Sequence, residues 1–237
     1  MSDEKPTRRT PYVETFDDGP GGWISGVPAR NRPLDRLPTE VENGALLCRG
    51  PWWIDYNHAP PGGGYLHLLG YMHTHPSFLS DYEQPNRFID GGYSRDFTNA
   101  RLTVRVRGEI DFQGSELVLL AQADVPGTRT NYVLTGQSIA VTPEWSETTL
   151  VLSLDPSEWQ CLGTRWDRTE MYGYGEIRDV LADLNCDIIF VLFPLDVVPL
   201  EPIEDMHHPM AGRDYEVDRS RLPTGWLEID TVRLEYP

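Results

Sequence analysis

The stretch Gly62–His75 (GGGYLHLLGYMHTH) carries the side chains best suited to chemistry. In a β-strand, successive side chains alternate between two faces. One face would then carry Leu66, Leu68, Gly70, Met72 and Thr74, and the other His67, Leu69, Tyr71, His73 and His75. Because buried His and Tyr side chains must each find a hydrogen-bond partner, we expect the Leu/Met face to pack inward. The His/Tyr face is then expected to line a concave surface that solvent reaches.

The histidines suggest metal ligation as one use of this strand. His73 and His75 have a spacing that occurs in cupin-type metal sites, with His58 just before the strand and His207-His208 late in the chain. Glu83 follows further along than that pattern expects, and no later strand carries an obvious fourth ligand. Histidine binds metals only when neutral and suitably oriented, so spacing alone is poor evidence. We therefore do not expect a transition metal.

Saccharide contact is a second use of the same region. Sugars are held by planar polar groups that bond their hydroxyls and by aromatic rings beneath their apolar faces. The stretch Trp52–His58, expected to be a loop, offers both kinds in Trp52, Trp53, Tyr56, Asn57 and His58. Binding sites commonly lie on loops held by a rigid scaffold. The alternative is that the indoles fill the core and the tyrosines cover edges.

Catalysis is a third use. Arg101, Arg105 and Arg107 share one face of a neighbouring strand, and arginine suits bidentate capture of a carboxylate. With His and Tyr, such a face could perform β-elimination on uronic-acid polymers, in which a base removes the proton beside a neutralised carboxylate. In that reaction His67 or His73 would be the base, Tyr71 the acid and Arg105 the neutraliser, with His75, Arg101 and Arg107 as further ligand contacts. The alternative is a solvated arginine face paired with the many acidic residues.

The elements that must position these residues read as strands. Leu102, Val104 and Val106 alternate with arginine and threonine, which is typical of a half-buried strand. Asn43-Gly44 predicts a hairpin turn. Further strands are expected at 115–125, 130–141, 147–154, 186–195 and 225–236, and a single short helix at 176–184. The stretch 186–195 is almost wholly apolar, which predicts a strand buried on both faces.

Composition bounds the class of protein. The chain has 237 residues and a formal charge of −17, which argues against nucleic-acid binding because duplex recognition needs a basic surface. Three cysteines in no metal-type spacing imply no disulfide framework. The sequence shows no secretory signal and no apolar stretch long enough for a membrane span. As written, the chain is expected to be cytoplasmic, or secreted or periplasmic if a leader peptide has been removed.

Four segments resemble the galactose-binding-like jelly roll of many carbohydrate-binding modules and of the complex I intermediate-associated family. They are FDDGPGGW (16–23), YSRDFTNARLTVRVRG (93–108), PEWSETTLVLSLDPSEW (143–159) and GWLEIDTVRLEY (225–236). The resemblance implies that the N- and C-terminal strands lie side by side, with a structural calcium near them. The residues matching that calcium pattern are Glu14, Asp17 and Asp230. Asp17-Asp18-Gly19 also reads as ordinary turn chemistry.

The sequence therefore predicts an all-β, jelly-roll sandwich of two antiparallel sheets with one short helix and long loops. Residues 1–11 are expected to be a disordered tail, and residues 12–237 a single domain. The first expected function is carbohydrate binding on the concave face, with uronic-acid sugars among the candidates. A polysaccharide lyase using the same residues is the first alternative, followed by a cupin-like metalloenzyme and by a structural module. Neither nucleic acid nor membrane is an expected partner.

Overall fold

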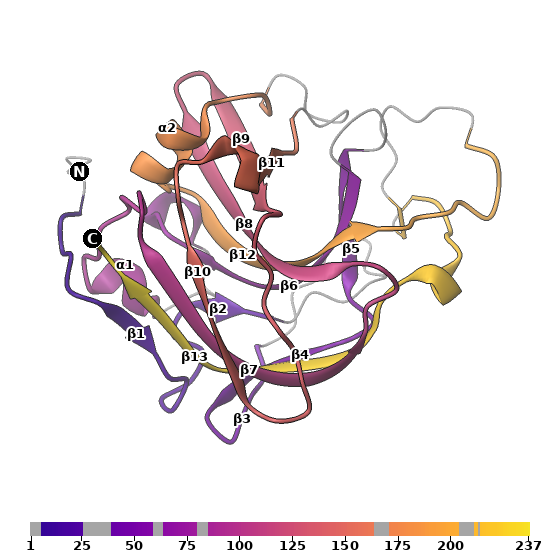
Figure 1. Ribbon diagram of the computed structural model, residues 1–237, viewed down its shortest axis with the longest axis horizontal. Coiled ribbons are helices and arrows are strands. Elements are labelled where there is room, and N and C mark those ends of the chain that lie inside the picture. Colours follow the sequence, from indigo (N-terminus) through magenta and orange to yellow (C-terminus); the bar gives the residue numbers. More distant parts are fainter. Residues whose placement is uncertain are drawn as a thin grey trace.

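The computed structural model describes residues 6–25, 39–58, 64–79, 85–163, 171–203, 211–212 and 214–237. Within them the chain forms two antiparallel β-sheets packed face to face, with little helix (Figure 1). The predicted all-β sandwich is confirmed. Two features singled out from the sequence, Glu83 and His207-His208, lie outside the described residues.

The first sheet is built around the last strand of the chain. Its order is β10 (Ser146–Val151), β7 (Arg101–Asp111), β13 (Thr224–Glu235), β4 (Ala45–Arg49) and β3 (Val41–Glu42). β1 (Tyr12–Glu14) also pairs with β13, with Tyr12 opposite Leu234. The first and last strands thus lie side by side, as the resemblance implies. Asn43 and Gly44 join β3 to β4 with positive φ angles of 51° and 75°, the primed turn that the Asn-Gly pair predicts.

The second sheet has β12 near its centre. Its order is β11 (Trp159–Cys161), β9 (Thr128–Leu134), β8 (Glu116–Val125), β12 (Asp187–Leu195), β6 (Gly64–His73) and β2 (Trp23–Ile24). β5 (Trp53–His58) also pairs directly with β6. It lies along the first half of β6, whereas β2 pairs with Tyr71 and Met72 near its end. The stretch containing Trp53–His58, expected to be a loop, is therefore mainly an edge strand. At its start Trp53 and Ile54 are both buried, in the outer and the inter-sheet apolar cluster respectively.

In the described residues, helical structure is confined to short elements. α2 (Ile177–Ala182) confirms the helix expected at 176–184 and buries Ile177, Val180 and Leu181. α1 (Arg87–Asp90) is a single turn. The 3₁₀ turns are η1 (Pro76–Phe78), η3 (Pro156–Glu158) and η4 (Arg219–Arg221). Within the described part of the chain, no helix has the length and apolarity to cross a membrane.

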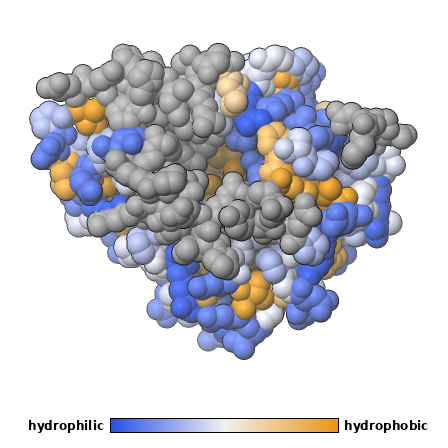
Figure 2. Space-filling view, turned by 180° about the vertical axis from the view of Figure 1, so that it is seen from behind, coloured by the Kyte–Doolittle hydropathy of each residue, from blue (hydrophilic) through white to orange (hydrophobic). Residues whose placement is uncertain are grey.

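Two apolar clusters hold the sandwich together. The larger lies between the sheets, where the Trp23 indole stacks on Phe190 at 5.3 Å between ring centroids. The smaller covers the outer side of the seven-stranded sheet and includes Ile189 and Val191. Successive residues of β12 therefore enter different clusters, which explains why this strand is apolar almost throughout. Seen from behind, the described surface is mostly hydrophilic with scattered hydrophobic residues (Figure 2).

The N-terminal residues expected to be disordered are placed from Pro6 onward. The Arg8 N–H donates to the Gly92 carbonyl at 3.2 Å, and the Ser94 N–H donates to the Arg8 carbonyl at 2.9 Å. The Arg9 guanidinium lies 3.0 Å from the Asp96 carboxylate. A segment that looks polar and structureless alone is held here by backbone pairing with a distant loop.

Candidate binding pocket

A β-bulge in β6 decides where the predicted site residues lie. In the β6–β12 register, Phe190 pairs with Gly70 and Val191 pairs with Leu68, so Leu69 has no opposite residue. An extra residue on one strand reverses the alternation of side chains beyond it. The bulge thus places His67 on the inter-sheet side, whereas Tyr71 and His73 lie on the outer side. The prediction that these three side chains share one face is wrong.

The apolar cluster in which each residue of β6 packs shows the same change of side at the bulge. Before the bulge, Tyr65 packs in the inter-sheet cluster and Leu66 in the outer one. Beyond it, Tyr71 packs in the outer cluster and Met72 in the inter-sheet one. Only an inserted residue lets Tyr65 and Tyr71, six positions apart, point in opposite directions.

The outer pair does not line a solvent-reachable surface. Tyr71 and His73 are each 6% exposed, and the His73 Nδ1 is hydrogen-bonded to the Asp187 carboxylate. The His73 ring also stacks on Phe78, at 6.0 Å between centroids. His75 caps η1, where its Nδ1 accepts the Ser77 N–H at 3.2 Å. These groups serve packing and capping, so the predicted open His/Tyr face is wrong.

The arginine-rich face belongs to the other sheet. Leu102, Val104 and Val106 pack in the inter-sheet cluster, so the arginines of β7 point outward. Arg105 pairs with Asp230 at 2.8 Å and Arg107 with Glu228 at 2.5 Å. Both guanidinium groups lie over the Trp145 ring, 4.9 and 4.6 Å from its centroid, and Arg101 is exposed. This is the solvated, acid-paired arginine face that the sequence left open as an alternative.

The structure therefore does not bring the proposed catalytic set together. His67 lies between the sheets, Tyr71 and His73 lie outside one sheet, and Arg105 lies outside the other. The two tryptophans also diverge. Trp52 packs in the inter-sheet cluster and Trp53 in the outer one. The side chains of Tyr56, Asn57 and His58 lie outside the described residues.

The carboxylates of the expected calcium site have other partners. Glu14 is 1% exposed and forms an ion pair with Arg87, and it accepts the Phe16 N–H at 3.0 Å. Asp17 accepts the Thr15 hydroxyl at 2.8 Å, and Asp230 is held by Arg105 on the outer face. No group of three or more His, Cys, Asp or Glu side chains among the described residues could hold a metal. The residues present do not fit a calcium ion, which requires several converging oxygen ligands.

Chelation tests this directly. We expect EDTA to leave the thermal midpoint of unfolding unchanged, because the described carboxylates near β1 and β13 are engaged by arginines and backbone groups. Differential scanning calorimetry with and without EDTA measures the midpoint. A lower midpoint that added Ca²⁺ restores would contradict this expectation and support the calcium prediction.

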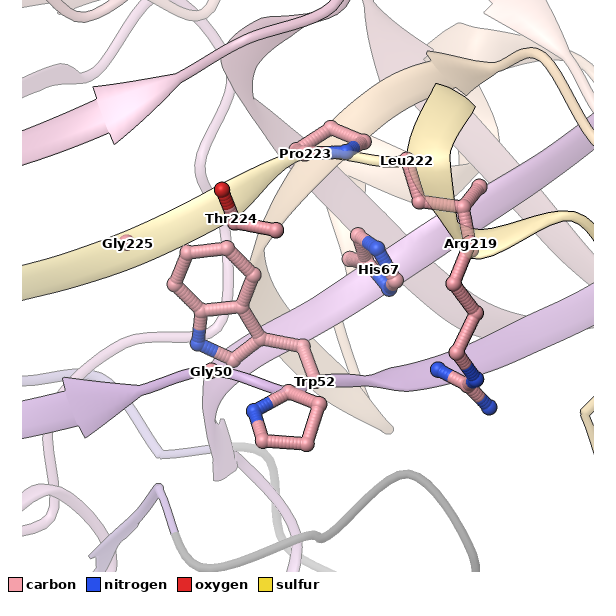
Figure 3. A pocket seen from close by; sticks show the side chains of 9 residues that line it. Gly50, Trp52, His67, Arg219, Leu222, Pro223, Thr224 and Gly225 are labelled. Atoms are coloured by element: carbon pink, nitrogen blue, oxygen red, sulfur yellow. The ribbon is translucent and has the colours of Figure 1, made fainter.

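A pocket of about 290 Å³ lies where β13 begins (Figure 3). The C-terminus lies at the other end of that strand (Figure 1). It is lined by Gly50, Pro51, Trp52, His67, Arg219, Leu222, Pro223, Thr224 and Gly225. Three parts of the chain supply these residues: the segment after β4, the middle of β6, and η4 with the start of β13. Figure 3 shows the His67 ring between the Trp52 indole and the Arg219 side chain.

The tautomer of His67 follows from its surroundings. The His67 Nδ1 lies 3.3 Å from the Trp53 carbonyl oxygen, which can only accept, so Nδ1 carries the proton. Burial lowers the pKa of His67 to about 4; the bond to the Trp53 carbonyl opposes this, and the charge of Arg219 adds to it. The imidazole is therefore neutral at pH 7, and Nε2 presents a lone pair.

That lone pair has no partner in the part of the chain that the structure describes. The His67 Nε2 is buried without a hydrogen bond among the described residues, and so is the Trp52 Nε1. The two rings lie 5.7 Å apart between centroids. A buried polar atom without a partner costs about 1–3 kcal/mol, so native proteins rarely leave one unless a ligand or water completes it. Two residues that line the pocket thus carry a buried acceptor and a buried donor that have no partner among the described residues.

The rest of the lining suits a small polar ligand with some apolar surface. Pro51, Leu222 and Pro223 provide apolar contacts, and Thr224 adds a hydroxyl. Arg219, half-buried on η4, supplies a cation. The cavity lies near the lower end of the volume range of ligand sites, roughly 300 Å³. Such a pocket could hold a molecule about the size of one sugar ring.

Sequence reasoning identified two of these residues, Trp52 and His67, and missed Arg219. Asp218 and Ser220 flank Arg219, and the Asp218 carboxylate accepts the Ser220 N–H at 3.0 Å. This local pattern signals a turn at 218–220. Nothing in it signals that the turn faces a strand 150 positions earlier in the chain.

Fold and pocket together define the class: an antiparallel β-sandwich with a ligand-sized pocket at one end. No family model and no curated protein matches the chain. Among solved structures, one from work on endo-acting O-glycanases that human gut microbiota express to initiate mucin breakdown has 14% identity, a TM-score of 0.40, and coverage of 95% of this chain and 98% of its own. The L4b domain of human laminin alpha-2 has 9% identity, a TM-score of 0.40, and coverage of 97% and 100%.

A third similar structure is the surface glycan-binding protein PbSGBP-B from Prevotella bryantii. It has 11% identity and a TM-score of 0.29, and the alignment covers 98% of this chain and 51% of that one. At these identities and scores the likeness carries no argument about function, which must come from the pocket.

Proposed function

We propose that this protein binds a saccharide, uronic-acid sugars included, in the pocket formed by Trp52, His67 and Arg219. The observation that carries the proposal is the Nε2 of the neutral His67, a residue that lines the pocket: this atom is buried and has no hydrogen-bond partner among the described residues. A sugar hydroxyl would donate to this atom, and another would accept from the Trp52 Nε1–H. Arg219 would bind the carboxylate of an acidic sugar, since guanidinium pairs well with carboxylates.

The proposed site lies away from the sheet face that the sequence predicts. His67 and Trp52 keep their roles as ligand contacts, at the end of the sandwich rather than on a concave sheet face. Trp53, Tyr71, His73 and the arginines of β7 take no part. The apolar lining would contact the C–H groups of the sugar ring.

Replacing His67 with leucine tests the proposal. We expect His67→Leu to weaken saccharide binding about 10- to 100-fold, because the loss of a buried hydrogen bond costs about 1–3 kcal/mol. His67→Gln, whose amide oxygen can accept a hydrogen bond, should retain part of the affinity. A glycan array of neutral and acidic oligosaccharides identifies a ligand, and titration calorimetry measures its Kd.

His75→Ala is the matched control, because His75 caps η1 outside the pocket. Its Kd should equal that of the wild type. Unchanged binding by His67→Leu, or no binding of any glycan by the wild type, would refute the proposed site.

A second candidate function is β-elimination in the same pocket. His67, neutral and with a free lone pair, would take the proton from the carbon beside a uronate carboxylate held by Arg219. The C–O bond to the leaving sugar would then break, giving an unsaturated product. Among the described residues no tyrosine lines the pocket, so water would have to protonate the leaving oxygen.

The low pKa of His67 favours saccharide binding over β-elimination as the function of the pocket. A general base works best when its pKa is near the operating pH, whereas the pKa of His67 is about 4. Incubation with uronic-acid polymers decides between the two. Growth of ultraviolet absorbance from the unsaturated product, lost in His67→Leu, would establish the lyase.

A further inference from the structure

The pocket adjoins a groove that the proposed function does not use. This groove, a hollow of about 480 Å³, is lined by Leu47, Arg49, Gly50, Gly225, Trp226 and Glu228. Gly50 and Gly225 line both spaces. The pocket opens between the sheets, whereas the groove lies on the outer face of the six-stranded sheet.

The alternation of β4 and β13 determines this outward placement. Leu227 and Cys48 pack in the inter-sheet cluster, so the residues on either side of each point outward. Antiparallel pairing sets Trp226 opposite Arg49 and Glu228 opposite Leu47. The groove is therefore a strip of adjacent side chains from two neighbouring strands.

The charges bordering the strip are already paired. Glu228 lies 2.5 Å from Arg107, and Arg49 lies 3.3 Å from Glu42. Between them Trp226 is half-buried, so part of its indole remains accessible. An aromatic ring flanked by polar groups suits a sugar unit, whose C–H face packs on the ring while its hydroxyls bond the charged groups.

Gly50 and Gly225 form a shared border of the pocket and the groove. The Gly50 N–H donates to the Gly225 carbonyl at 3.0 Å, and neither residue has a side chain that could form a wall. Gly225 has a φ of 134°, and a Cβ at that position would lie 1.9 Å from the Glu109 carbonyl oxygen. The sheet itself therefore requires glycine at 225. We call this border between the pocket and the groove, to which neither glycine contributes a side chain, the Gly50–Gly225 rim.

We propose that the ligand is an oligosaccharide that continues from the pocket across the Gly50–Gly225 rim, so that its next sugar packs on Trp226. This inference rests on the proposed function and adds the length of the ligand to it. Each sugar unit in contact contributes its own buried surface, so affinity should rise with chain length until the groove is filled.

The test compares chain lengths on the intact protein. Mono-, di- and trisaccharides of the sugar series selected by the glycan array are titrated against the wild type, Trp226→Ala and Trp145→Ala. We expect the wild type to bind the disaccharide about tenfold more tightly than the monosaccharide, since one further sugar contact of about 1.4 kcal/mol changes Kd tenfold. Trp226→Ala should bind both equally, with the monosaccharide Kd unchanged.

Trp145→Ala is the matched control. Trp145 lies on the same outer face under Arg105 and Arg107, but it does not line the groove. This variant should keep the preference for the disaccharide. Trp226→Phe, which keeps an aromatic ring, should keep most of it and guards against a folding defect in Trp226→Ala.

The outcomes separate the two proposals. Equal wild-type affinity for the mono- and disaccharide would overturn the groove while leaving the pocket intact. A length preference that survives Trp226→Ala would also overturn it. No saccharide binding at any length would overturn the pocket and the groove together.

Discussion

Replacing Glu14 with alanine should lower the free energy of unfolding by about 3–5 kcal/mol. Removing one partner of a buried ion pair has a cost of this size because the groups left behind lose their compensation. The Glu14 carboxylate is 1% exposed and is the ion-pair partner of Arg87. It also accepts the N–H of Phe16, whose φ of 59° lies in the left-handed region. Urea denaturation at pH 7 measures the loss.

An exposed pair provides the matched control. Arg49 and Glu42 lie 3.3 Å apart with side chains 59% and 49% exposed. Glu42→Ala should cost less than about 1 kcal/mol, because exposed ion pairs contribute little. A similar loss in the free energy of unfolding for Glu14→Ala and Glu42→Ala would contradict the prediction that the buried ion pair of Glu14 is the more stabilising of the two.

The contacts of Glu14 also explain why the FDDGPGGW segment (16–23) contains glycine at position 21. Gly21 has a φ of 60°, and a Cβ at that position would lie 1.9 Å from the Glu14 Oε2. The glycine therefore lets the turn close over the carboxylate. The Trp23 Nε1–H donates to the Tyr12 hydroxyl at 3.3 Å, which ties the end of the segment to β1. The packing of the segment around Glu14 therefore accounts for Gly21 and for Trp23.

The stability of the protein should fall by about 3 kcal/mol between pH 7 and pH 4 through His67 alone. Burial lowers the folded-state pKa of His67 from 6.5 to about 4. Between these values the unfolded chain binds a proton that the folded chain does not, so stability rises with pH across this window. The contribution is fully present above about pH 6.5 and is lost as the pH falls toward 4.

Two proteins are needed for this measurement, because other groups titrate in the same range. The free energy of unfolding is measured from pH 4 to pH 7 for the wild type and for His67→Gln. The variant should show a pH dependence smaller by about 3 kcal/mol over that range. Parallel profiles would show that His67 is not the buried neutral imidazole described above.

Sequence patterns predicted the strands well where the alternation was uninterrupted. β7 alternates apolar and polar residues along most of its length, and its outward arginines follow directly. The Asn43-Gly44 hairpin, α2 and the doubly buried β12 were also predicted, because each depends on local chemistry. Pairing of β1 with β13 came from the resemblance rather than from any local signal.

The site was harder to predict because it depends on one inserted residue. A bulge at Leu69 leaves no mark in the residue types of β6, yet it sends His67 and His73 to opposite faces. Its existence is determined by the pairing of β6 with β12, more than 100 positions away in sequence. Trp52 and Trp53 pack in different clusters because adjacent residues of an extended chain point to opposite sides.

Sequence patterns could not have assigned Arg219 to the pocket. Its type is common, its neighbours are ordinary turn formers, and its contact with the pocket arises from the way η4 leads into β13. Long-range packing, rather than composition or spacing, assembles the three segments around His67. Only a three-dimensional structure reveals such an arrangement.

The position of β13 has a consequence for how the protein folds. This strand pairs with β7, β4 and β1, so it is the centre of its sheet, although all three lie far from it in the sequence. Until β13 docks, β7 and β4 each have an unpaired edge, which is prone to wrong pairing, and pairings so distant in sequence form slowly. The same strand begins at Thr224 in the wall of the pocket. The pocket and the completed sheet should therefore form together during folding, and a ligand of the pocket would favour the folded chain over partly folded forms.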